Sequence, residues 1–140
     1  MVLAGLTPPE WEITIVDENL GVPDYPAMPR PDLVGITAFI SQPKRAYELA
    51  ARFRRLGVPV VMGGIHSTMR LDEAGERVDS VVTGEAESVW AQVLADTRHG
   101  GLKRRYDGGF AEIGKVPPAG MICWLEDMRS EPFRPRAVVL

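Results

Sequence analysis

An apolar run that ends in two glycines constrains the fold of this chain more than any other stretch. Residues 58–62 read Val-Pro-Val-Val-Met, and Gly63 and Gly64 follow directly, ahead of a polar segment at 65–68. A short, largely β-branched run of this kind predicts a strand buried on both faces. Glycines at its end indicate that another backbone or a ligand comes close, because a Cβ would obstruct the approach.

The rest of the chain alternates between strand-like and helix-like patterns. Further strands are predicted at 12–16, 33–39 and 80–83, and apolar spacings of three and four predict helices over 43–56, 71–77 and 86–97. Residues 2–6 resemble the last turn of a helix. This alternation predicts an α/β, doubly wound parallel sheet with helices on both faces.

Two segments do not follow this pattern. Four prolines within 20–31 predict a long loop. Residues 107–140 predict an irregular tail or linker remnant that ends in a short strand, separate from an α/β domain over 1–106.

Length and composition exclude several classes of function. The chain has 140 residues, 45% hydrophobic and 25% charged, with a net charge of −3, which fits one ordinary globular domain. The sequence has no basic stripe, so nucleic acid is not an expected partner. No apolar run is long enough to span a membrane. A cytoplasmic location is expected, since the N-terminus lacks the pattern of a signal peptide. The single cysteine, Cys123, cannot form an internal disulfide or hold an iron–sulfur cluster by itself.

The carboxyl ends of the predicted strands supply the candidate site. In parallel sheets the loops after the strands meet at one edge, where ligands bind. Those loops are 17–19, 37–42, 63–68 and 84–87.

Several motifs, taken in order, resemble one family. The stretches 6–19, 32–37, 45–50, 57–68 and 82–87 are similar to the cobalamin-binding domain that precedes the catalytic domain in cobalamin-dependent radical SAM enzymes. The resemblance covers about residues 3–106. It implies a flavodoxin-like (Rossmann-like) domain that holds the corrin of cobalamin over the carboxyl edge of the sheet.

The resemblance also implies a set of cofactor-binding residues. Glycines suit positions where the nucleotide arm passes the backbone, and hydroxyl and amide groups suit its phosphate and the corrin side amides. The implied residues are Thr37, Ala38, Ser41, Gln42, Gly63, Gly64, His66, Ser67, Thr68, Gly84, Glu85 and Glu87.

The chain departs from the family pattern in three ways. The family's first strand is missing, and we expect Arg136–Leu140, from this chain or a second copy, to fill its place or to cap an edge. The Asp-x-His-x-x-Gly signature for histidine ligation of cobalt is absent. The CxxxCxxC cluster motif is absent too, and 115–118 resembles the linker that would lead to it, so radical chemistry would need a separate radical SAM partner.

Individual residues keep two interpretations. His66 could approach the cofactor, or it could cap a helix or form a hydrogen bond within its loop. Asp17 and Glu18 could form an acid pair, or a turn and a helix cap. Glu85 and Glu87 could contact the cofactor or lie in a helix's first turn.

Three functions are compatible with these residues. The first is a cobalamin-binding module that is not catalytic by itself. The second is a truncated relative that no longer binds cofactor and serves as a protein-interaction or homodimerisation domain. The third is a phosphoreceiver or flavin-binding domain, but Thr37-Ala38 and Gly84-Glu85 stand where a receiver needs aspartate and lysine.

Overall fold

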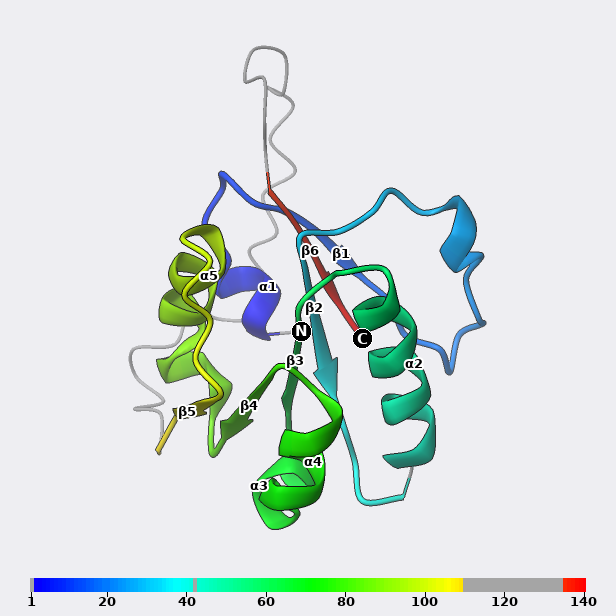
Figure 1. Cartoon of the computed structure of the whole chain (residues 1–140). Coiled ribbons are helices and arrows are strands. Elements are labelled where there is room, and N and C mark those ends of the chain that lie inside the picture. The colour runs from blue at the N-terminus through cyan, green and yellow to red at the C-terminus, as the bar shows by residue number, and fades with distance from the viewer. Residues whose placement is uncertain (1, 42, 110–134) are drawn as a thin grey trace.

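The computed structural model describes residues 2–41, 43–109 and 135–140. The elements within these ranges follow the predicted alternation of strands and helices (Figure 1). They are α1 (Val2–Leu6), β1 (Glu12–Ile15), η1 (Tyr25–Ala27), β2 (Leu33–Thr37), α2 (Pro43–Arg55), β3 (Val60–Gly63), α3 (Ile65–Met69), α4 (Leu71–Arg77), β4 (Ser80–Thr83), η2 (Ala86–Ser88), α5 (Trp90–Arg98), β5 (Arg105–Asp107) and β6 (Arg136–Val139).

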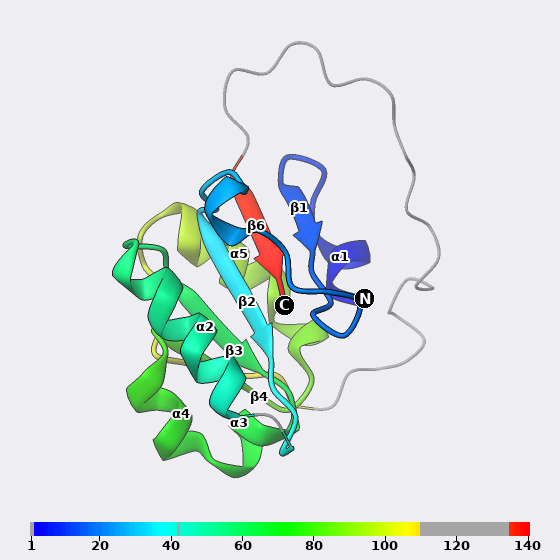
Figure 2. The same ribbon diagram turned by 90° about the vertical axis from the view of Figure 1, so that its right-hand side faces the viewer.

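The strands form one six-stranded sheet with the order β1-β6-β2-β3-β4-β5, and all its pairings are parallel. Helices α2, α3 and α4 lie on one side of the sheet, and α1 and α5 lie on the other (Figures 1 and 2). The chain therefore adopts the predicted α/β flavodoxin-like fold.

Two apolar clusters hold these layers together, one on each face. Alternate residues of a strand point to opposite faces, so Val34 joins the cluster under α2 while Leu33 joins the cluster under α5. Trp90, predicted to be core, is 2% exposed, and its Nε1 donates a hydrogen bond of 2.9 Å to Oγ1 of Thr7. That bond ties α5 to the segment that follows α1.

Strand β6 fills the place predicted for the missing first strand. Ala137 is paired with Ile13 of β1 on one side and with Leu33 of β2 on the other. Both Ala137 and Val138 are buried. With β6 counted first, the order β1-β6-β2-β3-β4 is the flavodoxin-like order 2-1-3-4-5. The predicted position of the C-terminal segment, between β1 and β2, is confirmed within this chain.

The structure differs from the predicted elements in places. Strand β5 was not predicted, because three residues carry too little pattern to be recognised. Residues 65–69 form helix α3 instead of a loop. The first part of the helix predicted over 86–97 is the separate turn η2.

The remaining sequence features lie partly outside the described residues. Cys123 and the linker-like segment 115–118 lie outside the described residues. The predicted domain boundary at residue 106 stays a prediction. Among the residues that the structure describes, no helix has both the length and the apolar character that a membrane crossing requires.

Candidate cofactor site at the carboxyl edge

Near β6 the sheet is covered by α2 on one face and by α1 on the other, and a crevice opens there at the carboxyl edge. Two cavities flank the ends of β1, β6 and β2. The α2-side cavity, about 360 Å³, lies between the 17–19 loop and α2. The α1-side cavity, about 300 Å³, lies between α1 and the 84–87 loop. In doubly wound sheets a crevice at such a position is where ligands bind.

Three residues line both cavities: Ile15, Thr37 and Val139. Thr37 is exposed at the end of β2. Its hydroxyl forms no hydrogen bond within the described parts of the chain, whereas its backbone N–H donates to the Leu140 carbonyl at 2.7 Å. Thr37 therefore offers a free donor and acceptor where the two cavities meet.

Gly64 is required for a reason that the sequence left open. Its φ of +95° and ψ of −177° lie in a region that only glycine adopts readily. A Cβ here would lie 2.9 Å from the carbonyl oxygen of Ala38, so the close approach is made by the backbone of the β2–α2 loop. Of the two possibilities that the sequence indicated, a neighbouring backbone by itself explains Gly64. The residue nevertheless lines the α1-side cavity.

The other predicted glycines differ from one another. A Cβ on Gly63 would meet nothing closer than Val82 Cβ, at 3.9 Å. A Cβ on Gly84, whose φ is +70°, would lie 2.7 Å from the carbonyl oxygen of Gly109. Only Gly84 of these two lines a cavity of the crevice.

His66 points away from the crevice. Its side chain is 5% exposed, and its Nε2 lies 2.8 Å from the hydroxyl oxygen of Tyr47 on α2. His66 lines neither cavity. His66 therefore forms an internal hydrogen bond, but to helix α2 and not within its own loop or as a helix cap.

Ser67 and Thr68 join neighbouring loops. The Ser67 hydroxyl is fully buried and donates to the Gly64 carbonyl at 2.9 Å. The Thr68 hydroxyl donates to the same carbonyl at 3.1 Å and accepts from the Gly84 N–H at 3.2 Å. These two residues position the glycines and do not line either cavity.

An ion-pair cluster forms the outer wall of the α2-side cavity. Arg45 donates through Nη2 and Nε to the two carboxylate oxygens of Glu18, at 2.7 and 2.8 Å. The Tyr25 hydroxyl donates to the same carboxylate at 2.8 Å. Hydrogen bonds from Arg45, with a smaller contribution from Tyr25, lower the pKa of Glu18 below its ordinary value. The prediction that Glu18 caps a helix is wrong, because its carboxylate binds Arg45 of α2 instead.

Asp17 forms a turn, the second of the two interpretations that its sequence position allowed. Its Oδ1 accepts hydrogen bonds from the backbone N–H and the side-chain amide of Asn19, at 2.9 and 2.8 Å. This is a local turn. No local sequence pattern predicts the Arg45 to Glu18 pair, since the two residues lie 27 positions apart.

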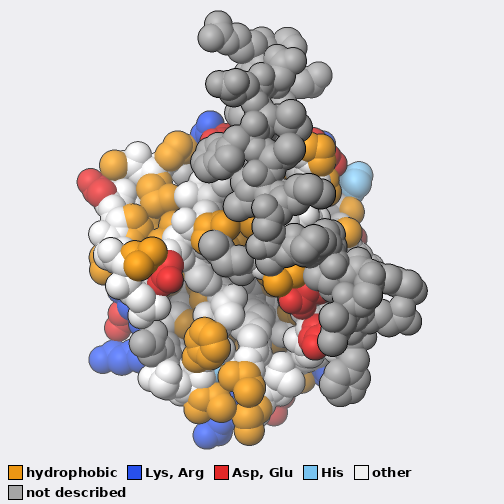
Figure 3. Space-filling view, turned by 180° about the vertical axis from the view of Figure 1, so that it is seen from behind, with side chains coloured by type: hydrophobic (Ala, Val, Ile, Leu, Met, Phe, Trp, Pro, Cys, Tyr) orange, Lys and Arg blue, Asp and Glu red, His pale blue; other side chains and the backbone are white. Residues whose placement is uncertain are grey.

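The rim of the crevice is apolar and exposed. Phe39 and Ile40 of the β2–α2 loop are 65% and 56% exposed, and Ile65 and Met69 of α3 are 55% and 67% exposed. Figure 3 shows hydrophobic side chains at the lower end of the molecule, toward which β2 points in Figure 1. Of these four residues, Phe39 also lines the α2-side cavity.

The remaining predicted residues have mixed positions. Glu85 and Glu87 line the α1-side cavity, and Ala38 lines the α2-side cavity. Ser41 is exposed beside the apolar rim, and Gln42 lies outside the described residues. In the described ranges, no group of three or more His, Cys, Asp or Glu side chains is placed to hold a metal ion.

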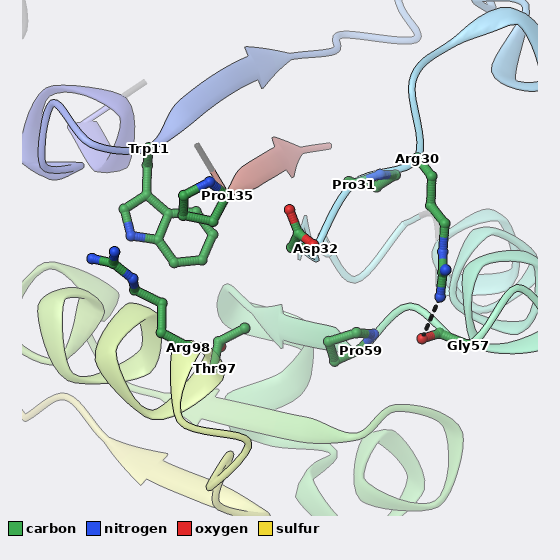
Figure 4. Close-up of a pocket in the computed structure, with 9 residues that line it drawn as sticks. All are labelled: Trp11, Arg30, Pro31, Asp32, Gly57, Pro59, Thr97, Arg98 and Pro135. Carbon is green, nitrogen blue, oxygen red and sulfur yellow. Dashed lines mark hydrogen bonds between the residues drawn. The ribbon is translucent and has the colours of Figure 1, made fainter. Parts of the chain in front are cut away.

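A further cavity, about 430 Å³, lies at the opposite, amino edge of the sheet (Figure 4). It contains none of the predicted site residues. Arg30 and Arg98 stand on different sides of it, and Arg30 donates to the Gly57 carbonyl at 3.2 Å.

Fold and site together define a flavodoxin-like α/β domain with a two-part crevice at its carboxyl edge. The chain is similar to two enzymes of Chlorobaculum tepidum. It is 40% identical over 123 residues to bacteriochlorophyllide d C-8(2)-methyltransferase, a match that covers 84% of this chain. It is 34% identical over 106 residues to bacteriochlorophyllide d C-12(1)-methyltransferase, which covers 76% of the chain.

These relatives are much longer than the chain. The matched parts are 26% and 23% of their lengths, so the chain spans about a quarter of each. No family model matches the sequence, and no solved structure matches it.

Proposed function

We propose that this chain is a cobalamin-binding module that is not catalytic by itself. The observation that carries the proposal is the crevice at the end of β6, where two cavities meet at the free hydroxyl of Thr37 beside an apolar rim. A flat macrocycle with a nucleotide arm needs such a combination: an apolar surface for the ring and a narrow cavity for the arm.

The residues at the crevice fit this cofactor. The apolar side chains of Phe39, Ile40 and Ile65 would contact the corrin. Thr37 and the backbone at Gly64 and Gly84 would contact the nucleotide arm in the α1-side cavity. Cobalamin supplies an alkyl-carrying cobalt to an enzyme that uses it, and this chain would hold the cofactor for a radical SAM partner.

The similarity to methyltransferases supports the same proposal. The resemblance to the cobalamin-binding domain of cobalamin-dependent radical SAM enzymes covers strands β1 to β4 and the loops that follow them, and it leaves out β6. The bacteriochlorophyllide methyltransferases match over most of this chain. Their bacteriochlorophyllide substrates would belong to the complete system and not to this module.

The alternative is a relative that no longer binds cofactor and acts as an interaction or dimerisation domain. The exposed side chains of Phe39, Ile40, Ile65 and Met69 favour it, since such a surface also suits a protein contact. Loss of the cofactor does not follow from a gap in the sheet, because β6 lies between β1 and β2.

A titration with hydroxocobalamin separates the two functions. We expect the full chain to retain the cofactor through gel filtration, with the visible absorption eluting at the protein peak. The Thr37→Val variant should lose affinity, by about fivefold or more for one hydrogen bond. Thr14→Val is the matched control, because Thr14 is an exposed strand threonine that lines neither cavity. Elution of all colour in the salt volume would contradict the proposal, and a protein peak at twice the chain mass would then favour the alternative.

A further inference from the structure

A separate pocket lies between the proline-containing loop and the C-terminal part of α2. It has a volume of about 390 Å³ and shares no lining residue with the two cavities of the crevice. Its lining is mostly apolar, and its only charged members are two arginines. The lining residues are Tyr25, Pro26, Met28, Pro29, Arg30, Pro31, Arg52, Phe53, Leu56 and Val138.

The walls of this α2-loop pocket are held in place by packing. Tyr25 is 9% exposed, and its ring meets the Phe53 ring edge to face, with centroids 5.8 Å apart. The hydroxyl of Tyr25 is fixed by Glu18. Leu56, by contrast, is 55% exposed at the mouth of the pocket. The pocket is therefore preformed, with an apolar residue at its entrance.

Arg52 is the unusual member of the lining. Its guanidinium lies over the Tyr25 ring, 5.3 Å from the centroid, and its Nε is buried without a hydrogen-bond partner. No ion pair of Arg52 occurs in the part of the chain that the structure describes. Glu48, one helical turn earlier, pairs with Arg45 at 3.3 Å instead. The Nη groups of Arg52 also form no hydrogen bond in the described structure, so they can donate to an acceptor supplied from outside.

Arg30 adds a second positive charge at the pocket. Only one of its N–H groups is used in the described structure, in the bond to the Gly57 carbonyl (Figure 4). No carboxylate lines the pocket. Two arginines beside an apolar space are complementary to an anion with an apolar body.

We propose that the α2-loop pocket binds a small carboxylate with an aromatic or branched apolar body. The body occupies the space between the prolines, Phe53 and Leu56, and the carboxylate accepts hydrogen bonds from Arg52. The pocket shares no lining residue with the two cavities of the crevice, so cobalamin bound at the crevice would not occupy it.

The proposal is tested with 2-naphthoate as the probe and uncharged 2-naphthamide as its isostere. Nitrogen-15 spectra of the full chain, titrated with each compound, locate and quantify binding. We expect 2-naphthoate to shift the N–H resonances of the non-proline residues in 25–31 and of residues 52–56, and to bind more tightly than the amide. Arg52→Gln should weaken naphthoate binding by about tenfold or more, the loss expected for a charge-assisted hydrogen bond.

Two further variants complete the test. Arg55→Gln is the matched control, because Arg55 is exposed on the same helix and does not line the pocket, and its naphthoate affinity should be unchanged. Leu56→Glu places a carboxylate at the mouth, on an exposed position that tolerates it, and should abolish naphthoate binding. Equal affinity for acid and amide, no effect of Leu56→Glu, or shifts only outside these segments would overturn the proposal.

Discussion

Replacement of Gly64 by alanine should destabilise the domain strongly, whereas replacement of the adjacent Gly63 should not. The backbone of Gly64 lies in a region that costs a residue with a Cβ roughly 1–3 kcal/mol. The new Cβ would also lie 2.9 Å from the Ala38 carbonyl oxygen, which forces a backbone shift of similar cost. The sum is roughly 2–6 kcal/mol, a large part of the stability of a typical domain.

The matched variant Gly63→Ala controls for the loss of a glycine from the same loop. Its Cβ would meet no atom closer than 3.9 Å, and its φ is not in the left-handed region. Alanine should restrict the unfolded chain slightly, so the free energy of unfolding should change by less than about 1 kcal/mol.

Urea unfolding followed by circular dichroism measures both variants. In thermal unfolding of a domain of this size, each kcal/mol of lost stability corresponds to a fall in Tm of about 4 °C. The reasoning is refuted if Gly64→Ala and Gly63→Ala unfold at the same urea concentration, because the contact with Ala38 would then not determine the requirement for glycine.

Three further predictions concern other parts of the structure. Val138→Asp should abolish cooperative unfolding in urea, because Val138 is only 4% exposed and the new carboxylate would be buried in the middle of the sheet. A normal unfolding transition would show that β6 is not needed for the fold. Because the Arg45 contact gives Glu18 a lower pKa in the folded than in the unfolded state, its stabilisation is present above the ordinary value of 4.5 and is lost as pH falls through the folded pKa. Glu18→Gln should therefore flatten the acid side of a stability–pH curve measured by urea unfolding, and a curve of unchanged shape would contradict the contact. Tyr47→Phe should cost about 0.5–1.5 kcal/mol of stability in the same assay by removing the bond to His66, yet leave the affinity for hydroxocobalamin unchanged, and an altered affinity would return His66 to the cofactor site.

The sequence predicted the class of fold and the edge of the sheet at which the loops meet, because both depend on short-range patterns. Apolar runs that end in glycine or polar residues mark strand ends, and in a parallel sheet these ends must share one edge. That logic brought Thr37, Gly64 and Gly84 to the same crevice. The slot for β6 was also predictable, because a strand missing from the middle of the sheet leaves two neighbours to be satisfied.

The details of the site depend on contacts that no local pattern records. The Tyr47 to His66 bond joins residues 19 positions apart, and the Arg45 to Glu18 pair joins residues 27 apart. Helix α3 was missed because five residues directly after a glycine pair carry no helical periodicity of their own. The role of Gly64 was ambiguous from the sequence, since only coordinates distinguish a neighbouring backbone from a ligand.

The position of β6 has a consequence for how the protein is made. During synthesis β1 leaves the ribosome early, but its only neighbour in the described sheet is not translated until more than a hundred residues later, as the 124-position separation of Glu12 and Arg136 shows. Pairings between such distant residues slow folding. Until β6 arrives, β1 and the near side of β2 present unpaired strand edges, so the nascent chain passes through a stage at which chaperones would find a target.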